Sequence, residues 1–211
     1  MSAVPAEEPV ASPENAVPLL NLANVLTGVR LVLVPFFLLA LLHLDGTDLG
    51  WRLVAALLFA VAAITDRFDG EIARKRGLVT SFGKIADPIA DKALMGAALV
   101  GLSVLAILPW WVTVVIMGRE VGVTVLRFWV IRHGVIPASK GGKLKTLVQT
   151  FAIGLYVLPL TLLLPSAAGA VEIVRWTFMA AAVVLTVVTG LDYVLRAIRL
   201  RAAARAALRR V

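Results

Sequence analysis

Long apolar runs follow one another along most of this chain, and they restrict its fold more than any other feature of the sequence. The hydrocarbon core of a bilayer needs ~20 helical residues to span it. Runs close to that length predict six transmembrane helices, in residues 24–43, 51–65, 88–108, 110–131, 144–164 and 174–195. We therefore expect an all-α polytopic membrane protein with six transmembrane helices.

Composition supports a membrane protein. Hydrophobic residues make up 60% of the chain, the charged share is only 16% and the mean hydropathy is +0.93, which is far more apolar than a soluble domain. The absence of cysteine excludes disulfides, thiolate metal sites and a cysteine nucleophile. The net charge of +8 fits lysine and arginine held near anionic lipid. We expect no nucleic acid partner, because no basic soluble module is present.

The two ends of the chain differ from its apolar middle. Residues 1–20 are rich in glutamate and proline and lack the basic start and apolar core of a secretory signal, so they predict a disordered N-terminal tail. Residues 21–198 form the expected six-helix transmembrane domain. Residues 199–211 form a basic C-terminal tail, predicted as a helix on anionic lipid, with binding of a regulator as the alternative.

The distribution of basic residues predicts the orientation in the membrane. Lysine and arginine crowd the segments after the expected second, fourth and sixth helices and are sparse after the others, where Arg52 and Arg175 are the main exceptions. Because cytoplasmic segments carry the excess of positive charge, both termini and the stretch from Asp66 to Asp91 should face the cytoplasm. For a chain of this kind we expect the cell inner (plasma) membrane.

Four carboxylates in the stretch from Asp66 to Asp91, which we interpret as a break between two membrane helices, form the strongest candidate site. Asp66 pairs with Asp69, and Asp87 pairs with Asp91, at spacings that place each pair on one helical face. Four such acids repel one another unless cations intervene, and oxygen ligands favour magnesium or manganese. The alternative is an ordinary solvated loop, with the acids paired to nearby arginine and lysine.

Residues beside these acids are suited to a phosphate-bearing ligand. Gly70 permits a close approach to the backbone, and Arg74 supplies a guanidinium fork that fits phosphate. In the first expected helix a polar stripe should face protein or substrate rather than lipid; it comprises Asn21, Asn24, Thr27 and Arg30. The alternative for Arg30 is a side chain that extends to the membrane interface.

The spacing D-x2-D-G-x2-A-R-x8-G-x3-D-x3-D, in DRFDGEIARKRGLVTSFGKIADPIADK, resembles the signature of the CDP-alcohol phosphotransferase family. That resemblance implies the family's fold, a six-helix membrane enzyme that moves a phosphate-linked group from a CDP-activated donor to an alcohol and releases CMP. It further implies that two divalent metals are bound by Asp66, Asp69 and Asp87, with Asp91 at the metals and acting as the base. Gly70, Arg74 and Thr80 would lie beside the cytidine nucleotide, with Arg30 nearby.

Ionisable residues within the fourth expected helix indicate the class of the acceptor. Arg119 and Arg127 are eight residues apart, so both can border one cavity, and intramembrane charge is a functional-site hypothesis by default. Glu120 between them has the alternative role of neutralising a neighbour. With the lysines at the start of the fifth helix, these arginines suit an acceptor that carries a phosphate.

A further resemblance covers most of residues 21–155. NLANVLTGVRLVLVPFF, GREVGVTVLR and GKLKT are similar to the bacterial phosphatidylglycerophosphate synthase branch of that family. The branch implies transfer of the phosphatidyl group from CDP-diacylglycerol to sn-glycerol 3-phosphate, with the acceptor phosphate held by Arg119, Arg127 and Lys143. It also implies two Mg²⁺ (or Mn²⁺) ions per active site, contact with membrane lipid, and a homodimer.

Other functions stay open on the sequence alone. Within the same enzyme class, inositol phosphate or phosphatidylglycerol are alternative acceptors. A small transporter is a more distant alternative, although no inverted repeat is visible. A membrane scaffold would leave the spacing of the aspartates unexplained.

Overall fold

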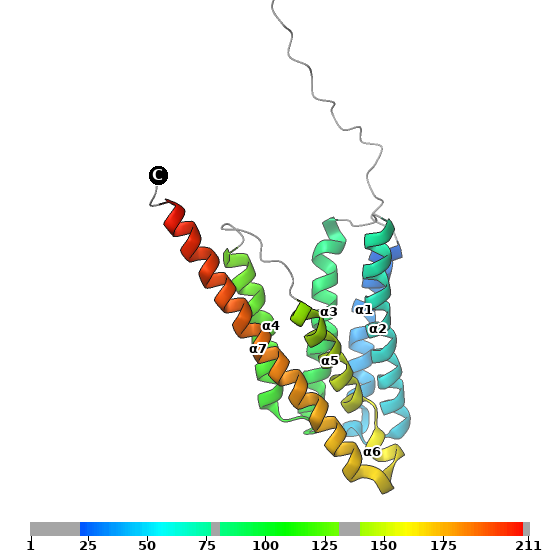
Figure 1. The fold of residues 1–211 in the computed structure, drawn as a ribbon. Helices are drawn as coiled ribbons and strands as arrows, with labels where there is room; N and C mark the ends of the chain where they lie inside the picture. The colour runs from blue at the N-terminus through cyan, green and yellow to red at the C-terminus, as the bar shows by residue number, and fades with distance from the viewer. Residues whose placement is uncertain (1–21, 77–80, 131–139, 209–211) are drawn as a thin grey trace, which may run out of the picture.

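The computed structural model (Figure 1) describes residues 22–76, 81–130 and 140–208, which are helical apart from short connections and contain no strand. Side chains are described for residues 24–66, 89–126, 129 and 141–202. The elements are α1 (Leu22–Leu42), η2 (His43–Gly46), α2 (Leu49–Arg76), α3 (Ser81–Val104), α4 (Trp110–Val130), α5 (Lys140–Val157), α6 (Leu160–Leu163), η4 (Pro165–Ala167) and α7 (Ala168–Leu208). The all-α class expected from the apolar runs is confirmed for these ranges.

Most of each expected apolar run is helical, but only some of the helices described have the length and apolarity of a membrane span. Three candidate spans are present in the described part of the chain: Asn24–Gly46, Leu49–Asp66 and Pro165–Ala202. The remaining long helices, α3, α4 and α5, each carry several ionisable residues. These charges make α3 to α5 less apolar than α1, so six spans stay a prediction.

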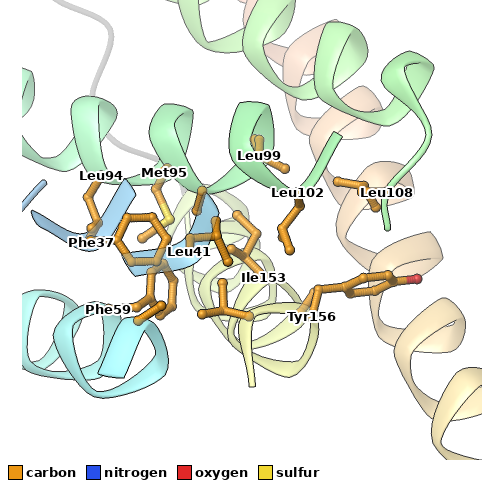
Figure 2. Close-up of a cluster of buried hydrophobic side chains, with 14 of the residues drawn as sticks. Phe37, Leu41, Phe59, Leu94, Met95, Leu99, Leu102, Leu108, Ile153 and Tyr156 are labelled. Carbon is orange, nitrogen blue, oxygen red and sulfur yellow. The ribbon is translucent and has the colours of Figure 1, made fainter. Parts of the chain in front are cut away.

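The core lies where α1, α2, α3 and α5 meet (Figure 2). Phe37 of α1 packs near Phe59 of α2, with ring centroids 5.8 Å apart, and Leu99 of α3 and Ile153 of α5 are fully buried in the same cluster. A Cβ added to Gly101 of α3 would lie 2.7 Å from a methyl carbon of a leucine in α1. Glycine therefore lets α1 and α3 approach closely.

The long helices alternate in direction, so their ends collect at two ends of the bundle (Figure 1). The beginnings of α1, α3 and α5 lie at the same end as the terminations of α2, α4 and α7. We call this the site end, because the stretch from Asp66 to Asp91 lies there. The opposite end holds η2, the α3–α4 connection, α6 and η4.

At the opposite end, α5 stops earlier than expected and two arginines bind its last carbonyls. The fifth expected helix runs to residue 164, whereas α5 ends at Val157, because Pro159 has no N–H to continue the ladder. Arg52 donates from Nη2 to the carbonyls of Tyr156, at 2.9 Å, and of Val157, at 3.1 Å. Arg175 donates to two neighbouring carbonyls, at 3.0 and 2.9 Å.

The last helix is longer than expected at both ends. The sequence predicts a helix over 174–195 and a separate basic tail from residue 199, but α7 runs from Ala168 to Leu208 without a break. It packs along α4 and α5. The guanidinium of Arg201 lies 4.1 Å from the centre of the Trp129 ring in α4, so the described start of the expected tail continues the last helix.

Candidate active site

The aspartate stretch is mostly helical, and its four acids lie on two helices that contact each other. Asp66 and Asp69 belong to α2, which extends to Arg76, while Asp87 and Asp91 belong to α3, which starts at Ser81. The interpretation of the whole stretch as a break between helices is therefore wrong in extent, since α2 continues to Arg76 and α3 already begins at Ser81. The helical spacing expected for each pair of acids is confirmed.

Two of the four acids have described side chains. Gly70 and Arg74 lie in the last turns of α2, but their side-chain surroundings, like those of Asp69 and Asp87, fall outside the described residues. Thr80 also lies outside them. The geometry of the site is therefore built on Asp66 and Asp91.

Arg30 of α1 holds Asp66 in position. Its Nη1 lies 2.6 Å from Oδ1 of Asp66, and its Nε donates to the carbonyl of Ala62 at 3.3 Å. Arg30 is only 1% exposed, and Asn24 and Thr27 of the same polar stripe are also buried. The described members of the stripe thus face protein, as the sequence predicts, and a side chain extended to the membrane interface is excluded for Arg30. Asn21 lies outside the described residues.

Asp91 lies half-buried on α3 within electrostatic reach of charges from four other helices. The carboxylates of Asp66 and Glu120 repel it, while Arg30 and Lys145 attract it. Carboxylates within electrostatic reach of one another in a partly desolvated site favour a bound cation. Their oxygen donors fit Mg²⁺ or Mn²⁺, although no cluster of three candidate metal ligands occurs within the described residues.

A cavity of about 80 Å³ opens beside Asp91, between α3, α4 and α5. Its polar lining includes Asp91 and Lys92 from α3, Glu120 from α4, and Lys145 and Gln149 from α5. Met95 and Ile116 supply apolar wall. A space of this size admits a phosphate-sized group rather than a large ligand.

Glu120 is the centre of the charged network at this cavity. Its Oε1 accepts from Lys145 Nζ and, at 3.2 Å, from Arg119 Nη1. Arg119 also donates from Nη2 to Oγ1 of Thr189 on α7, at 3.0 Å. Lys92 donates to Thr124, whose hydroxyl donates to the backbone carbonyl of Glu120 at 2.7 Å.

The structure brings only part of the expected acceptor site together. Arg119 is half-buried in the network, whereas the side chain of Arg127 in α4 is outside the described residues. Lys143 is exposed and does not line the cavity, while Lys145 is buried and does. Residues two apart on a helix point about 200° apart, so the two lysines face different surroundings.

Gln149 is a site residue that the sequence did not predict, and Lys145 did not stand out from the other lysines at the start of α5. Gln149 follows Lys145 by four residues, so both lie on one face of α5, and both are 4% exposed. That spacing was a signal in the sequence. A lysine with the same neighbours on a solvated helix shows the same pattern, so only packing distinguishes the buried residue.

Comparison with known proteins identifies the family. Residues 20–188 match the family model described as CDP-alcohol phosphatidyltransferase. The chain belongs to the CDP-alcohol phosphatidyltransferase family. The matched range contains all four aspartates, the charged residues that line the cavity, and Arg119, which contacts Glu120.

Relatives within the CDP-alcohol phosphatidyltransferase family are similar over most of their length. A probable phosphatidylglycerophosphate synthase of Mycobacterium tuberculosis is 60% identical over 179 residues, covering 85% of this chain and 82% of that protein. A CDP-diacylglycerol–glycerol-3-phosphate 3-phosphatidyltransferase of Bacillus subtilis is 38% identical, covering 82% and 93%. One of the same name from Escherichia coli is 39% identical over 140 residues, covering 63% and 74%.

Proposed function

We propose that this protein transfers the phosphatidyl group from CDP-diacylglycerol to sn-glycerol 3-phosphate, giving phosphatidylglycerophosphate and CMP. The observation that carries the proposal is the cavity in which Asp91 lies opposite buried Lys145, with Arg119 beside it. An acid that accepts a proton and cations that hold a phosphate are what a phosphorylated alcohol needs. The names of the relatives agree with this reaction.

On the donor side, we propose that Asp66, Asp69, Asp87 and Asp91 hold two Mg²⁺ (or Mn²⁺) ions. When bound, the ions neutralise the pyrophosphate of the donor. Arg30 keeps Asp66 oriented through its 2.6 Å contact. The resemblance assigns the nucleotide to Gly70, Arg74 and Thr80, with Arg30 nearby, and the position of Gly70 and Arg74 on the same helix as Asp66 supports this assignment.

Asp91 is suited to be the base of the reaction. Its carboxylate takes the proton of the acceptor's hydroxyl as that oxygen attacks the phosphorus of the phosphatidyl group. The new P–O bond forms as the bond between that phosphorus and the oxygen of CMP breaks, and CMP leaves with the electron pair.

On the acceptor side, the phosphate is assigned to Arg119, Arg127 and Lys143 by resemblance, and the cavity adds Lys145 to this set. Lys145 and Arg119 already converge on one anionic oxygen. Arginine and lysine that converge in this way suit a phosphate group. An acceptor without a phosphate would leave them with no role beyond pairing with Glu120.

We further propose six membrane spans in the inner (plasma) membrane, with both termini and the site end toward the cytoplasm. The concentration of lysine and arginine at the site end supports this orientation. CDP-linked donors would then reach the site from the cytoplasm while their acyl chains stay in membrane lipid. A homodimer is proposed from the family resemblance alone.

The proposed reaction is tested with purified protein in detergent micelles that contain CDP-diacylglycerol and Mg²⁺. Addition of sn-glycerol 3-phosphate should release CMP and form phosphatidylglycerophosphate. Inositol phosphate and phosphatidylglycerol, added separately, should release little CMP. Release with another acceptor alone would contradict the assignment, and the absence of CMP with every acceptor would favour a transporter.

Replacing Asp91 with asparagine tests the base. Asparagine keeps the shape but cannot accept the proton, so we expect CMP release to fall by about 10³-fold or more. The thermal unfolding midpoint should stay close to that of the unsubstituted protein, because asparagine fills the same volume. Activity within a few-fold of normal would exclude Asp91 as the essential base.

A further inference from the structure

Glu120 occupies the place where two cations of the proposed acceptor site meet. A single oxygen of its carboxylate, Oε1, accepts from both Lys145 and Arg119. These cations come from different helices, α5 and α4. An ordinary ion pair within one helix needs no such convergence, so the arrangement resembles a small anion site that is filled by a side chain of the protein itself.

Lys145 requires an anion in this position. It is 4% exposed, and a buried ammonium without a counter-ion is unfavourable. Its neighbours in the cavity include Asp91 and Gln149, and Gln149 Oε1 is buried with no hydrogen-bond donor. Without Glu120, Lys145 would lose its hydrogen-bonded carboxylate and keep only the longer-range attraction of Asp91, the proposed base.

Arg119 has a second attachment that does not depend on Glu120. Its Nη2 donates to Thr189 at 3.0 Å, and its side chain lies against Gly190, where an added Cβ would be 3.0 Å from Arg119 Cγ. The Nε of Arg119 is buried without an acceptor. Arg119 can therefore release Glu120 and stay in place, with donors still available.

We propose that Glu120 is a placeholder for the acceptor's phosphate. By pairing with Lys145 and Arg119, its carboxylate occupies the phosphate-binding position until the phosphate replaces it. This inference rests on the proposed function, since it assumes that these cations bind the acceptor phosphate. The carboxylate competes with any anion that enters. Inorganic phosphate must displace the carboxylate through its own contacts with Lys145 and Arg119 alone. The acceptor sn-glycerol 3-phosphate also offers hydroxyl groups to Asp91 and Gln149.

The placeholder makes a specific prediction about inorganic phosphate as a probe. Glu120→Gln keeps the size of the side chain but removes its charge, so phosphate no longer competes with a carboxylate. We expect the inhibition constant of inorganic phosphate against sn-glycerol 3-phosphate to fall about tenfold. The KM for sn-glycerol 3-phosphate should fall as well. The preference for sn-glycerol 3-phosphate over inorganic phosphate should become smaller.

A permanent structural role for Glu120 predicts the reverse. If the carboxylate only orients Lys145 and Arg119, its loss lets both cations move, and both the inhibition constant and the KM should rise. An unchanged or raised inhibition constant for phosphate in Glu120→Gln would overturn the proposal. Binding of phosphate to the full-length protein, followed by calorimetry, gives the same comparison without turnover.

Two further variants keep the test decisive. Glu120→Asp retains the charge but shortens its reach, so the inhibition constant should fall by less than in Glu120→Gln, and it serves alone if the glutamine variant does not fold. Glu172→Gln is the matched control, because Glu172 pairs with Arg175 at 2.9 Å at the opposite end of the bundle. Failure of the unsubstituted protein to use sn-glycerol 3-phosphate would refute the proposed function. If the unsubstituted protein uses it but Glu120→Gln leaves phosphate inhibition unchanged, only the placeholder role of Glu120 is refuted.

Discussion

Lys145 and Lys143 show how much the function of a charged residue depends on its surroundings. Both precede the apolar part of α5, but Lys145 is buried in the cavity with Asp91 while Lys143 is exposed. A buried cation close to the reacting groups binds phosphate in a medium where water competes weakly. An exposed lysine contributes to a field that salt screens.

We expect Lys145→Met to raise the KM for sn-glycerol 3-phosphate by about tenfold or more, through loss of a charge-assisted contact. Lys143→Met should change it by less and should lose most of its effect at high salt. Steady-state CMP release at varied acceptor concentration measures both. Equal effects of the two substitutions on KM would indicate that Lys143 binds the acceptor phosphate as directly as Lys145 does.

Sequence reasoning at the residue scale succeeded where spacing alone determines geometry. Helical periodicity places Asp66 and Asp69, and Asp87 and Asp91, about one turn apart, and it predicts the face of α1 on which Arg30 is buried. Periodicity does not predict which residues from other helices these side chains contact. Arg30 meets Asp66 across 36 positions of chain, and only the packing of α1 on α2 brings them together.

At the scale of elements, α4 and α7 meet closely at the point where Arg119 crosses between them. Gly190 of α7 provides the space, since a Cβ there would lie 3.0 Å from Arg119 Cγ. Glycine in a helix interior normally lowers stability relative to alanine. Its presence is explained by the arginine beside it.

Gly190→Ala should therefore displace Arg119 while stabilising the helix itself. We expect the KM for sn-glycerol 3-phosphate to rise several-fold with a much smaller change in kcat, because Arg119 binds the acceptor in our proposal and does not react. Gly169→Ala on the same helix meets nothing within 4 Å and is the matched control. A loss of kcat alone would show that Arg119 acts in the chemical step.

The termination of α5 depends on Arg52 and Arg175, whose roles the sequence did not reveal. From the sequence, both were only exceptions to the rule that lysine and arginine gather on the cytoplasmic side of the membrane. Both are instead 3% exposed, and their donors satisfy carbonyls that a helix interrupted by proline leaves without partners. The partners of Arg52 lie more than 100 positions away, beyond any local pattern.

Arg52→Met should lower the free energy of unfolding by about 2–4 kcal/mol, because two buried carbonyls lose their donor. The KM values should change much less than the stability below the unfolding temperature, because the two hydrogen bonds from Arg175 still hold this end of α5. Thermal unfolding in detergent measures the loss. Arg196→Met, which removes an exposed pair with Asp192, should change stability by less than about 1 kcal/mol, and a similar loss there would argue against the role of Arg52.

At the scale of the whole molecule, alternating helices bring the candidate chemistry to one end of the bundle. Asp66 lies about ten residues before the end of α2, Asp91 about ten after the start of α3, and Glu120 about ten before the end of α4. At 1.5 Å per residue each lies ~15 Å along its helix from that end. Apolar runs predicted this alternation, but α2 and α7 extend beyond those runs into charged segments that the hydropathy pattern does not mark as helical.

The convergence of acids at a common depth predicts dependence on a divalent cation. Treatment with EDTA should abolish CMP release, and Mg²⁺ or Mn²⁺ in excess should restore it, because the carboxylates of the site need cations to bind an anionic donor. Ca²⁺ prefers more ligands and longer distances, so it should restore less. Full activity after removal of metal would contradict the role assigned to the aspartates.

The two arginines on the final carbonyls of α5 also determine where Lys145 lies. Eleven positions of rigid helix separate Lys145 from Tyr156, so α5 is fastened to α2 and α7 at one end and presents its lysine to Asp91 at the other. Sliding of α5 along its axis would break four hydrogen bonds before it moved the lysine. The position of Lys145 along the bundle axis is thus set by hydrogen bonds at the opposite end of α5.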